Sequence, residues 1–312
     1  MKSDQGILNS FLIPKGFPTL PEDWNLSSET FSNASADGQL FSLRMKAEKP
    51  IKPYRVLFVV HGQGEHGGRY IHFPHFLKDT VSEVITFDLR GHGRSEGLRG
   101  HIGRFDDYTD DTKIFVERYQ QKINAERTGT PVEYHLFGHS MGGLIALRLL
   151  FLHPELTFAS ATVSAPLLEL KMHVAAIKKA AAYSLSRIWG NLQLTSELDP
   201  AFVCTDVNVQ EAYAKDRLVH SKATPRFFVE MQEAMKDARA RTSGIQTPLL
   251  FCIPMKDRIV DSDVTLAFAQ ALEFKNKEIR TYSDFEHESF NETEKETAFQ
   301  DLKSWIVKNS KS

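Results

Sequence analysis

The sequence predicts an α/β protein in which helices cover both faces of a mostly parallel sheet and one helical insertion interrupts the pattern. Short β-rich runs alternate with helical patterns along most of the chain, which is typical of parallel strands joined by helices. The alternation stops between Ser164 and about Ser243, where no convincing buried strand occurs. At 312 residues the chain is long enough for one large core and such an insertion.

The predicted sheet begins with an antiparallel hairpin at its edge, because residues 28–31 and 40–45 flank Asp37-Gly38, a pair suited to a tight turn. The later runs are short and mostly apolar, as expected of strands inside a sheet. They are residues 56–60, 84–87, 134–137, 158–163, 249–253 and 278–282.

Two helices are predicted within the insertion. Residues 173–188 are rich in Ala and Ile, and residues 225–241 carry Phe and Met at helical spacing. We expect each helix to pack its apolar side on the main domain, and a last helix around residues 299–307 closes the fold. The predicted units are an N-terminal arm (1–24), an α/β core (25–164 and 244–312) and a helical cap (165–243).

The composition excludes several classes of protein. The 38 Lys and Arg residues nearly balance 40 Asp and Glu residues, so no overall positive field would attract nucleic acid. Two cysteines cannot make a disulfide framework. No apolar stretch is long enough to span a bilayer, and the first residues lack the continuous apolar core of an export signal. We therefore expect a cytoplasmic protein, with a peripheral membrane contact through the arm or residues 173–188 as an open alternative.

A nucleophile elbow is predicted at Ser140. The sequence G-H-S-M-G, residues 138–142, lies directly after the predicted strand 134–137 and directly before the helical run 144–152. Such a turn forces the serine into a strained backbone conformation, and side chains at Gly138 and Gly142 would collide with neighbouring backbone. The strain exposes the Ser140 hydroxyl for nucleophilic attack.

A serine nucleophile needs a histidine base and a carboxylate that orients it, and in this architecture they follow in the order Ser, acid, His. His287 is the only histidine after His220 and follows the last predicted strand. For the acid we select Asp257, which follows the strand 249–253. The alternatives are Asp261 and Asp263, which suit the start of the next helix, and Glu169 after the preceding strand.

The oxyanion formed on acyl transfer needs two backbone N–H donors. Met141, the residue after the nucleophile, is the first candidate. Gln63 is the second, because it lies in a glycine-rich loop after the first central strand, and the glycines allow the main chain to approach a substrate closely.

No cofactor or metal ion is expected. The first third of the chain holds several histidines, but they lack the spacing of a zinc site. His139 is expected to pack and hydrogen-bond with its side chain directed away from Ser140. Asp88 and Arg90 are expected to fix the loop below the site.

Several motifs occur together in the order found in one known family. They are residues 61–66 with Arg69-Tyr70, residues 90–97, residues 138–143 and residues 164–166. On these motifs the chain resembles α/β-hydrolases of the monoacylglycerol lipase and bacterial lysophospholipase group, over roughly residues 25–308. The separations of 117 residues from Ser140 to Asp257 and 30 from Asp257 to His287 also suit that family.

The resemblance implies an α/β-hydrolase fold and hydrolysis of a small lipid ester, either a lysophospholipid or a monoacylglycerol. Two positions depart from the usual pattern, because Pro254 and Asp284 stand where the family commonly has glycine. Proline fixes φ and removes an N–H, so the approach to Asp257 is expected to differ. Two alternatives remain open: an esterase, thioesterase, peptidase or acyltransferase with the same three residues, and a catalytically silent binding scaffold.

Overall fold

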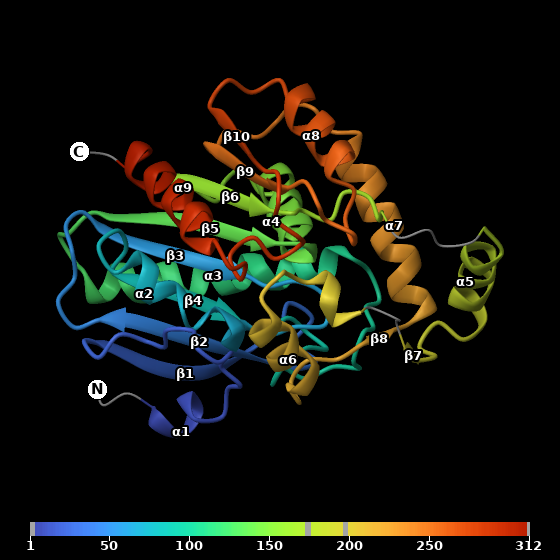
Figure 1. Cartoon of the computed structure of the whole chain (residues 1–312), viewed down its shortest axis with the longest axis horizontal. Helices are drawn as coiled ribbons and strands as arrows, with labels where there is room; N and C mark the ends of the chain where they lie inside the picture. The colour runs from blue at the N-terminus through green and yellow to red at the C-terminus, as the bar shows by residue number, and fades with distance from the viewer. Residues whose placement is uncertain (1–3, 172–175, 196–198, 311–312) are drawn as a thin grey trace.

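A computed structural model of the chain describes residues 4–171, 176–195 and 199–310. Its centre is an eight-stranded sheet with the strand order β1-β2-β4-β3-β5-β6-β9-β10 (Figure 1). β1 and β2 form the antiparallel hairpin at one edge, β2 also runs antiparallel to β4, and the remaining pairs are parallel. The prediction of a mostly parallel sheet with an antiparallel edge is therefore confirmed.

The eight predicted strands all occur, each with ends within a few residues of the expected ones. Their bounds are β1 (Trp24–Ser32), β2 (Gln39–Ala47), β3 (Tyr54–Val60), β4 (Glu83–Phe87), β5 (Val132–His139), β6 (Ser160–Ser164), β9 (Leu249–Pro254) and β10 (Lys277–Tyr282). β3, β4, β6 and β9 are buried throughout, and in β3 and β9 this burial explains why the sequences are nearly continuous apolar runs rather than alternating ones.

Helices cover both faces of the sheet. One face packs on α3 (Asp106–Glu126), α4 (Met141–Leu152) and α8 (Ser262–Ala271). The other packs on η1 (Gly67–Tyr70), α2 (Phe73–Leu77) and α9 (Lys295–Lys308), as Figure 1 shows for α2 and α9 in front of the sheet. Two apolar clusters, one on each face, make up most of the core.

The insertion forms a cap at the carboxyl ends of the central strands, on the right in Figure 1. Its described elements are α5 (Ala176–Ile188), β7 (Leu194–Thr195), η2 (Pro200–Phe202), α6 (Val207–Lys215), β8 (Lys222–Ala223) and α7 (Pro225–Arg239). The helix predicted over 225–241 is α7, and that predicted over 173–188 is α5, with residues 173–175 outside the described residues. β7 and β8 are two-residue strands that are not buried, so the described part of the insertion holds no buried strand, as expected.

The N-terminal arm packs on the main domain. It contains the short α1 (Gln5–Leu8) and continues to Trp24, where β1 begins. Phe11 and Trp24 are buried in the cluster that also holds α2 and α9. These two side chains therefore face the protein interior, and the arm does not present them to a membrane.

Candidate active site

Ser140 occupies the turn between β5 and α4 and has a strained backbone. Its φ of 53° and ψ of −117° lie where a side chain is rarely tolerated. The neighbouring glycines permit the turn. A Cβ on Gly138 would lie 2.4 Å from the carbonyl oxygen of Gly142, and one on Gly142 would lie 2.1 Å from that of Val60. The elbow therefore fits against β3 only with glycine at both positions.

His287 and Asp257 form a buried pair, with 2.7 Å between His287 Nδ1 and Asp257 Oδ2. The other carboxylate oxygen, Oδ1, accepts the backbone N–H groups of Ile259 at 2.7 Å and Val260 at 2.9 Å. Asp257 is thereby held at both oxygens. Since Nδ1 donates to the carboxylate, Nε2 is left as the acceptor of the ring.

The charges of the pair shift both pKa values. Burial alone would raise the pKa of Asp257, but His287 and the two backbone hydrogen bonds outweigh it and lower the pKa below the ordinary range. Burial alone would lower the pKa of His287, and the Asp257 charge and hydrogen bond outweigh it and raise the pKa. Asp257 is therefore ionised, and the imidazole is stabilised whenever it takes up a proton.

Two of the three rival acids have other partners, and the third lies in a helix. Asp261 is the N-cap of α8 and accepts from the backbone N–H groups of Asp263 and Val264. Asp263 lies in the first turn of that helix, and Glu169 pairs with Arg239 of the cap at 2.9 Å. Among the described residues, Asp257 is the carboxylate that reaches His287 Nδ1.

Two backbone N–H groups, one in the loop after β3 and one at the elbow, lack a hydrogen-bond acceptor among the described residues. The N–H of Gly62 donates to Glu65 Oε1 at 2.6 Å, whereas that of Gln63 has no acceptor among the described residues. Met141 is the first residue of α4, and an N–H in the first turn of a helix has no partner within the helix. These are the two N–H groups that the sequence selects as oxyanion donors.

Ser140 and His287 line one cavity of about 290 Å³ between the core and the cap. The apolar residues of the lining, which we call its apolar wall, include Leu167, Leu170, Phe227, Phe228, Met231 and Ile259. The polar residues of the lining, which we call its polar side, include Gln63, Glu65, His220 and Glu288. The arrangement can hold a molecule with a long apolar part and place a polar part beside Ser140.

Sequence reasoning missed a buried ion cluster at the polar side. Arg69 Nη1 lies 2.7 Å from Glu65 Oε2 and 2.6 Å from Glu288 Oε1, and Nη2 lies 2.7 Å from Glu288 Oε2. Tyr70 donates a further hydrogen bond to Glu65 at 2.9 Å. Burial raises the pKa of Glu65, but the Arg69 charge, the nearby histidines and the Gly62 N–H together outweigh this, and the net shift is downward. Arg69 and Glu288 are 219 residues apart, so no local pattern could have revealed the pair.

The expectation for His139 is wrong in one respect. Its side chain lines the cavity with Ser140, and its ring packs against that of His287 with 4.8 Å between the centroids. Burial, followed by the proximity of His287, lowers the pKa of His139 to about 4. A neutral ring next to His287 adds no second positive charge there.

The early histidines serve hydrogen bonds and packing instead. His61 bonds to backbone groups, His66 pairs with Asp216 at 3.0 Å, and His72 contacts the carbonyl oxygen of Phe290. No three His, Cys, Asp or Glu side chains converge to hold a metal ion within 4–171, 176–195 and 199–310. Over the same residues, no helix has both the length and the apolar composition needed to cross a membrane.

A family model described as serine aminopeptidase, S33, matches residues 51–294. The chain belongs to this family. Phospholipase YtpA of Bacillus subtilis is 28% identical over 256 residues, which are 82% of this chain and 95% of the relative. A monoglyceride lipase homolog of Monkeypox virus is 30% identical over 267 residues, which are 84% and 93% of the two chains.

A solved structure of a similar protein agrees with the fold. The crystal structure of a monoacylglycerol lipase from Paleococcus ferrophilus superposes with a TM-score of 0.75 at 25% identity, over 92% of this chain and 100% of the other. The S33 family member described here therefore has the α/β-hydrolase fold. Relatives differ in length: the chain spans 30% of an uncharacterized abhydrolase domain-containing protein of Dictyostelium discoideum, to which it is 27% identical.

Proposed function

We propose that this protein is a serine carboxylester hydrolase that releases a fatty acid from a lipid with one acyl chain. The observation that carries the proposal is the cavity that places Ser140 and His287 beside an apolar wall from the cap. The relatives are named as a phospholipase and a monoglyceride lipase homolog, which supports a lipid ester as the substrate. The cap that supplies the wall is taken as residues 165–243, the core as 25–164 and 244–312, and the arm as 1–24.

In the proposed reaction Ser140 Oγ attacks the acyl carbonyl carbon while His287 Nε2 accepts the hydroxyl proton. Asp257 holds the resulting imidazolium, and the N–H groups of Gln63 and Met141 stabilise the oxyanion. The oxyanion collapses to the acyl-enzyme as His287 returns the proton to the leaving alcohol. Water then attacks the acyl carbon, giving its proton to His287, and the fatty acid leaves as Ser140 regains a proton.

An ester substrate fits the polar side of the cavity better than the amino terminus of a peptide, despite the description of the family as aminopeptidases. Binding an ammonium group would need an unpaired carboxylate. Both oxygens of Glu288 are occupied by Arg69, and Glu65 also pairs with it. A neutral or phosphate-bearing alcohol would leave this pairing undisturbed.

The proposal is tested by a panel of a monoacylglycerol, lysophosphatidylcholine, lysophosphatidylethanolamine, a thioester and a peptide amide. We expect turnover of at least one of the three lipids to exceed that of the thioester and the peptide. Ser140→Ala should remove the activity with the circular dichroism spectrum unchanged. Undiminished turnover by Ser140→Ala, or turnover of the peptide alone, would refute the proposal.

We also propose that the end of α5 and the segment after it contact a lipid surface. Ile188 is 85% exposed, Trp189 60% and Leu194 49%. These apolar side chains lie on the cap, other residues of which line the cavity that would receive a lipid. We expect flotation with anionic liposomes, reduced several-fold by Ile188→Asp. Val307→Asp is the matched control, because Val307 is 54% exposed on α9; an equal reduction by both variants, or no flotation of the wild type, contradicts the proposal.

A further inference from the structure

Hydrogen bonds through His92 and Gln63 connect the loop after β4 to the cap. His92 Nδ1 lies 3.0 Å from the carbonyl oxygen of Arg90, and Nε2 lies 3.0 Å from Gln63 Oε1. The Gln63 amide nitrogen donates to the carbonyl oxygen of Lys222 in β8 at 3.3 Å. We call these three hydrogen bonds, from Arg90 to Lys222, the His92–Gln63 link.

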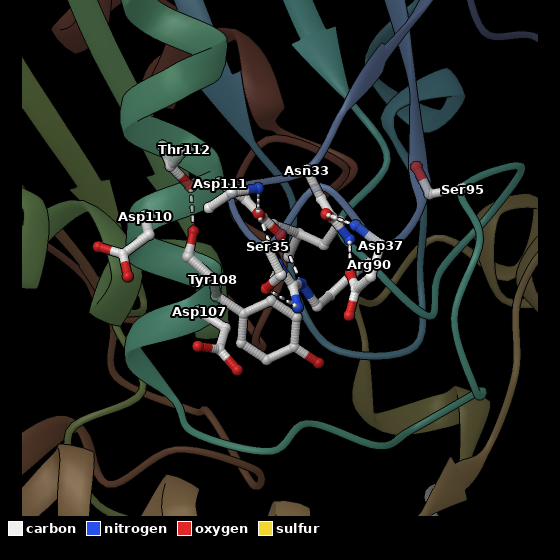
Figure 2. Close-up of polar contacts among 12 residues, drawn as sticks. Asn33, Ser35, Asp37, Arg90, Ser95, Asp107, Tyr108, Asp110, Asp111 and Thr112 are labelled. Atoms are coloured by element: carbon white, nitrogen blue, oxygen red, sulfur yellow. Dashed lines mark hydrogen bonds and ion pairs between the residues drawn. The ribbon is translucent and has the colours of Figure 1, made fainter.

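The core end of the link is held rigidly. The guanidinium of Arg90 makes a bidentate contact with the buried Asp111 of α3, at 2.6 and 2.7 Å (Figure 2). Asp111 also accepts the backbone N–H of Ala34 in the hairpin between β1 and β2. The carbonyl that faces His92 therefore belongs to a residue tied to two other elements of the core.

The complete link needs a proton on both ring nitrogens of His92. Each nitrogen faces an oxygen that accepts, while a neutral imidazole has only one N–H. Turning the Gln63 amide over would let neutral His92 accept from it, but Gln63 Oε1 would then face the Lys222 carbonyl oxygen, one acceptor against another. Every neutral form of His92 therefore gives up one of the three hydrogen bonds.

The groups packed around His92 favour its neutral form. The rings of His220 and His61 lie 4.8 and 5.3 Å from that of His92, and the Tyr108 ring lies at 6.2 Å. His61 and His220 each have one donor contact and one acceptor contact, which neutral imidazoles satisfy. Burial, then His220 and His61, and also Arg99, lower the pKa of His92 well below its ordinary value. Acid is therefore needed to complete the link.

We propose that His92 is a positioning residue for the oxyanion loop, residues 61–66, and acts on it through the side chain of Gln63. The inference rests on the proposed function, because it takes the backbone N–H of Gln63 as an oxyanion donor. The complete link holds Gln63 between core and cap and so restrains its backbone. A donor aimed at the developing charge stabilises the transition state, so the link affects kcat more than KM.

Gln63→Leu tests the proposal, because it removes the side-chain amide and keeps the backbone N–H. The measurement is kcat for a p-nitrophenyl ester as a function of pH. In the ratio of wild-type to variant kcat, the ionisation of His287 cancels. Because the pKa of His92 lies well below 6.5, we expect this ratio to stay constant down to about pH 5.5 and to rise about threefold only in more acid solution, with a smaller change in the KM ratio. A ratio that stays flat down to the lowest pH at which the protein remains folded overturns the proposal.

Two histidine variants show whether the change in the ratio comes from loss of the link or from weaker contact between core and cap in general. His92→Phe should give the same rise as Gln63→Leu, because it breaks the same link. His101 also joins core to cap, through Nδ1 and the Thr224 hydroxyl at 3.0 Å, but it does not contact Gln63. For His101→Phe we expect a flat ratio near one. The same rise with His101→Phe would overturn the proposal.

A measurement on the wild type avoids any dependence on the variants or on catalysis. In NMR spectra, the side-chain amide signals of Gln63 should move with pH together with the ring signals of His92. Amide signals that stay fixed while His92 titrates overturn the proposal. The NMR result does not depend on ester hydrolysis. If the protein hydrolysed none of the substrates in the panel, the spectra would still show whether His92 acts on the Gln63 side chain.

Discussion

His287 has two ring nitrogens, and Asp257 occupies one of them. The remaining nitrogen, Nε2, can accept a proton only when the ring is neutral and held in that tautomer. Asp257 selects that tautomer, because its Oδ2 accepts from Nδ1 while its Oδ1 is fixed by the backbone of Ile259 and Val260. The assignment of the acid therefore leads to two predictions.

Asp257→Asn keeps the size of the side chain and removes its charge and its preference for the required tautomer. We expect kcat for a short ester to fall by roughly three orders of magnitude or more. Asp261→Asn is the matched control, because asparagine caps a helix as well as aspartate does, and its kcat should stay within about twofold of the wild type. A large loss of kcat with Asp261→Asn and none with Asp257→Asn would show that Asp261 orients His287.

The raised pKa of His287 predicts the pH dependence. A general base must be unprotonated, so kcat/KM should increase with pH through a pKa above the ordinary value of 6.5. In Asp257→Asn the opposing charge is gone, burial remains, and the residual activity should reach its plateau at lower pH. The measurement is kcat/KM for a short ester from about pH 5 to about pH 9. If the low-pH side of the kcat/KM profile has the same apparent pKa in both proteins, Asp257 is not the cause of the raised His287 pKa.

At the scale of elements, the contact between β3 and the start of α4 fixes the elbow. The helix can approach the strand because Gly142 has no side chain: a Cβ there would lie 2.1 Å from the carbonyl oxygen of Val60 and 2.5 Å from that of His61. The same strand leads into the oxyanion loop, so a shift of α4 would also separate Met141 from Gln63.

Gly142→Ala should therefore destabilise the protein by about 1–3 kcal/mol in the free energy of unfolding, measured with urea. Activity should fall as well, because the two proposed oxyanion donors move apart. Gly103→Ala is the control. The nearest atom to its added Cβ would be at 3.6 Å, and we expect a change within about 0.5 kcal/mol. Equal losses of unfolding free energy at both positions would show that the close contact at Gly142 does not make an added side chain more destabilising.

The elements themselves were largely predictable, whereas contacts between distant elements were not. The buried strands are apolar runs, and the elbow needs two glycines at a fixed spacing, so both leave a local signal. The choice of Asp257 rested on its place after a strand. The orientation of His139, the pairing of Arg69 with Glu288 and the contact of His92 with Gln63 depend on how loops converge in three dimensions, and no short pattern encodes this.

At the scale of the whole molecule, the N-terminal arm joins core and cap into one body. Phe11 stacks on His66 with 5.9 Å between the ring centroids, and the Arg94 guanidinium lies 4.7 Å from the Phe11 centroid. His66 in turn pairs with Asp216 of the cap. The arm thus supports a residue that connects the oxyanion loop to the cap.

Phe11→Ala should lower the free energy of unfolding by about 3 kcal/mol, because the ring is 8% exposed and fills the space above Gly68. Leu12→Ala is the control in the same segment. Leu12 is 44% exposed, and we expect a loss of less than about 1 kcal/mol. Urea unfolding measures both, and equal small losses would mean that the arm adds little to the stability of the fold.

The most direct test of the proposed chemistry is to find where a serine-directed reagent attaches. Wild-type protein treated with a fluorophosphonate should gain one adduct, which peptide mass spectrometry should locate on Ser140. Labelling should be slowed strongly in His287→Ala and abolished in Ser140→Ala. An unlabelled wild type, or an adduct on another serine that persists in Ser140→Ala, would contradict the assignment of Ser140 as the nucleophile.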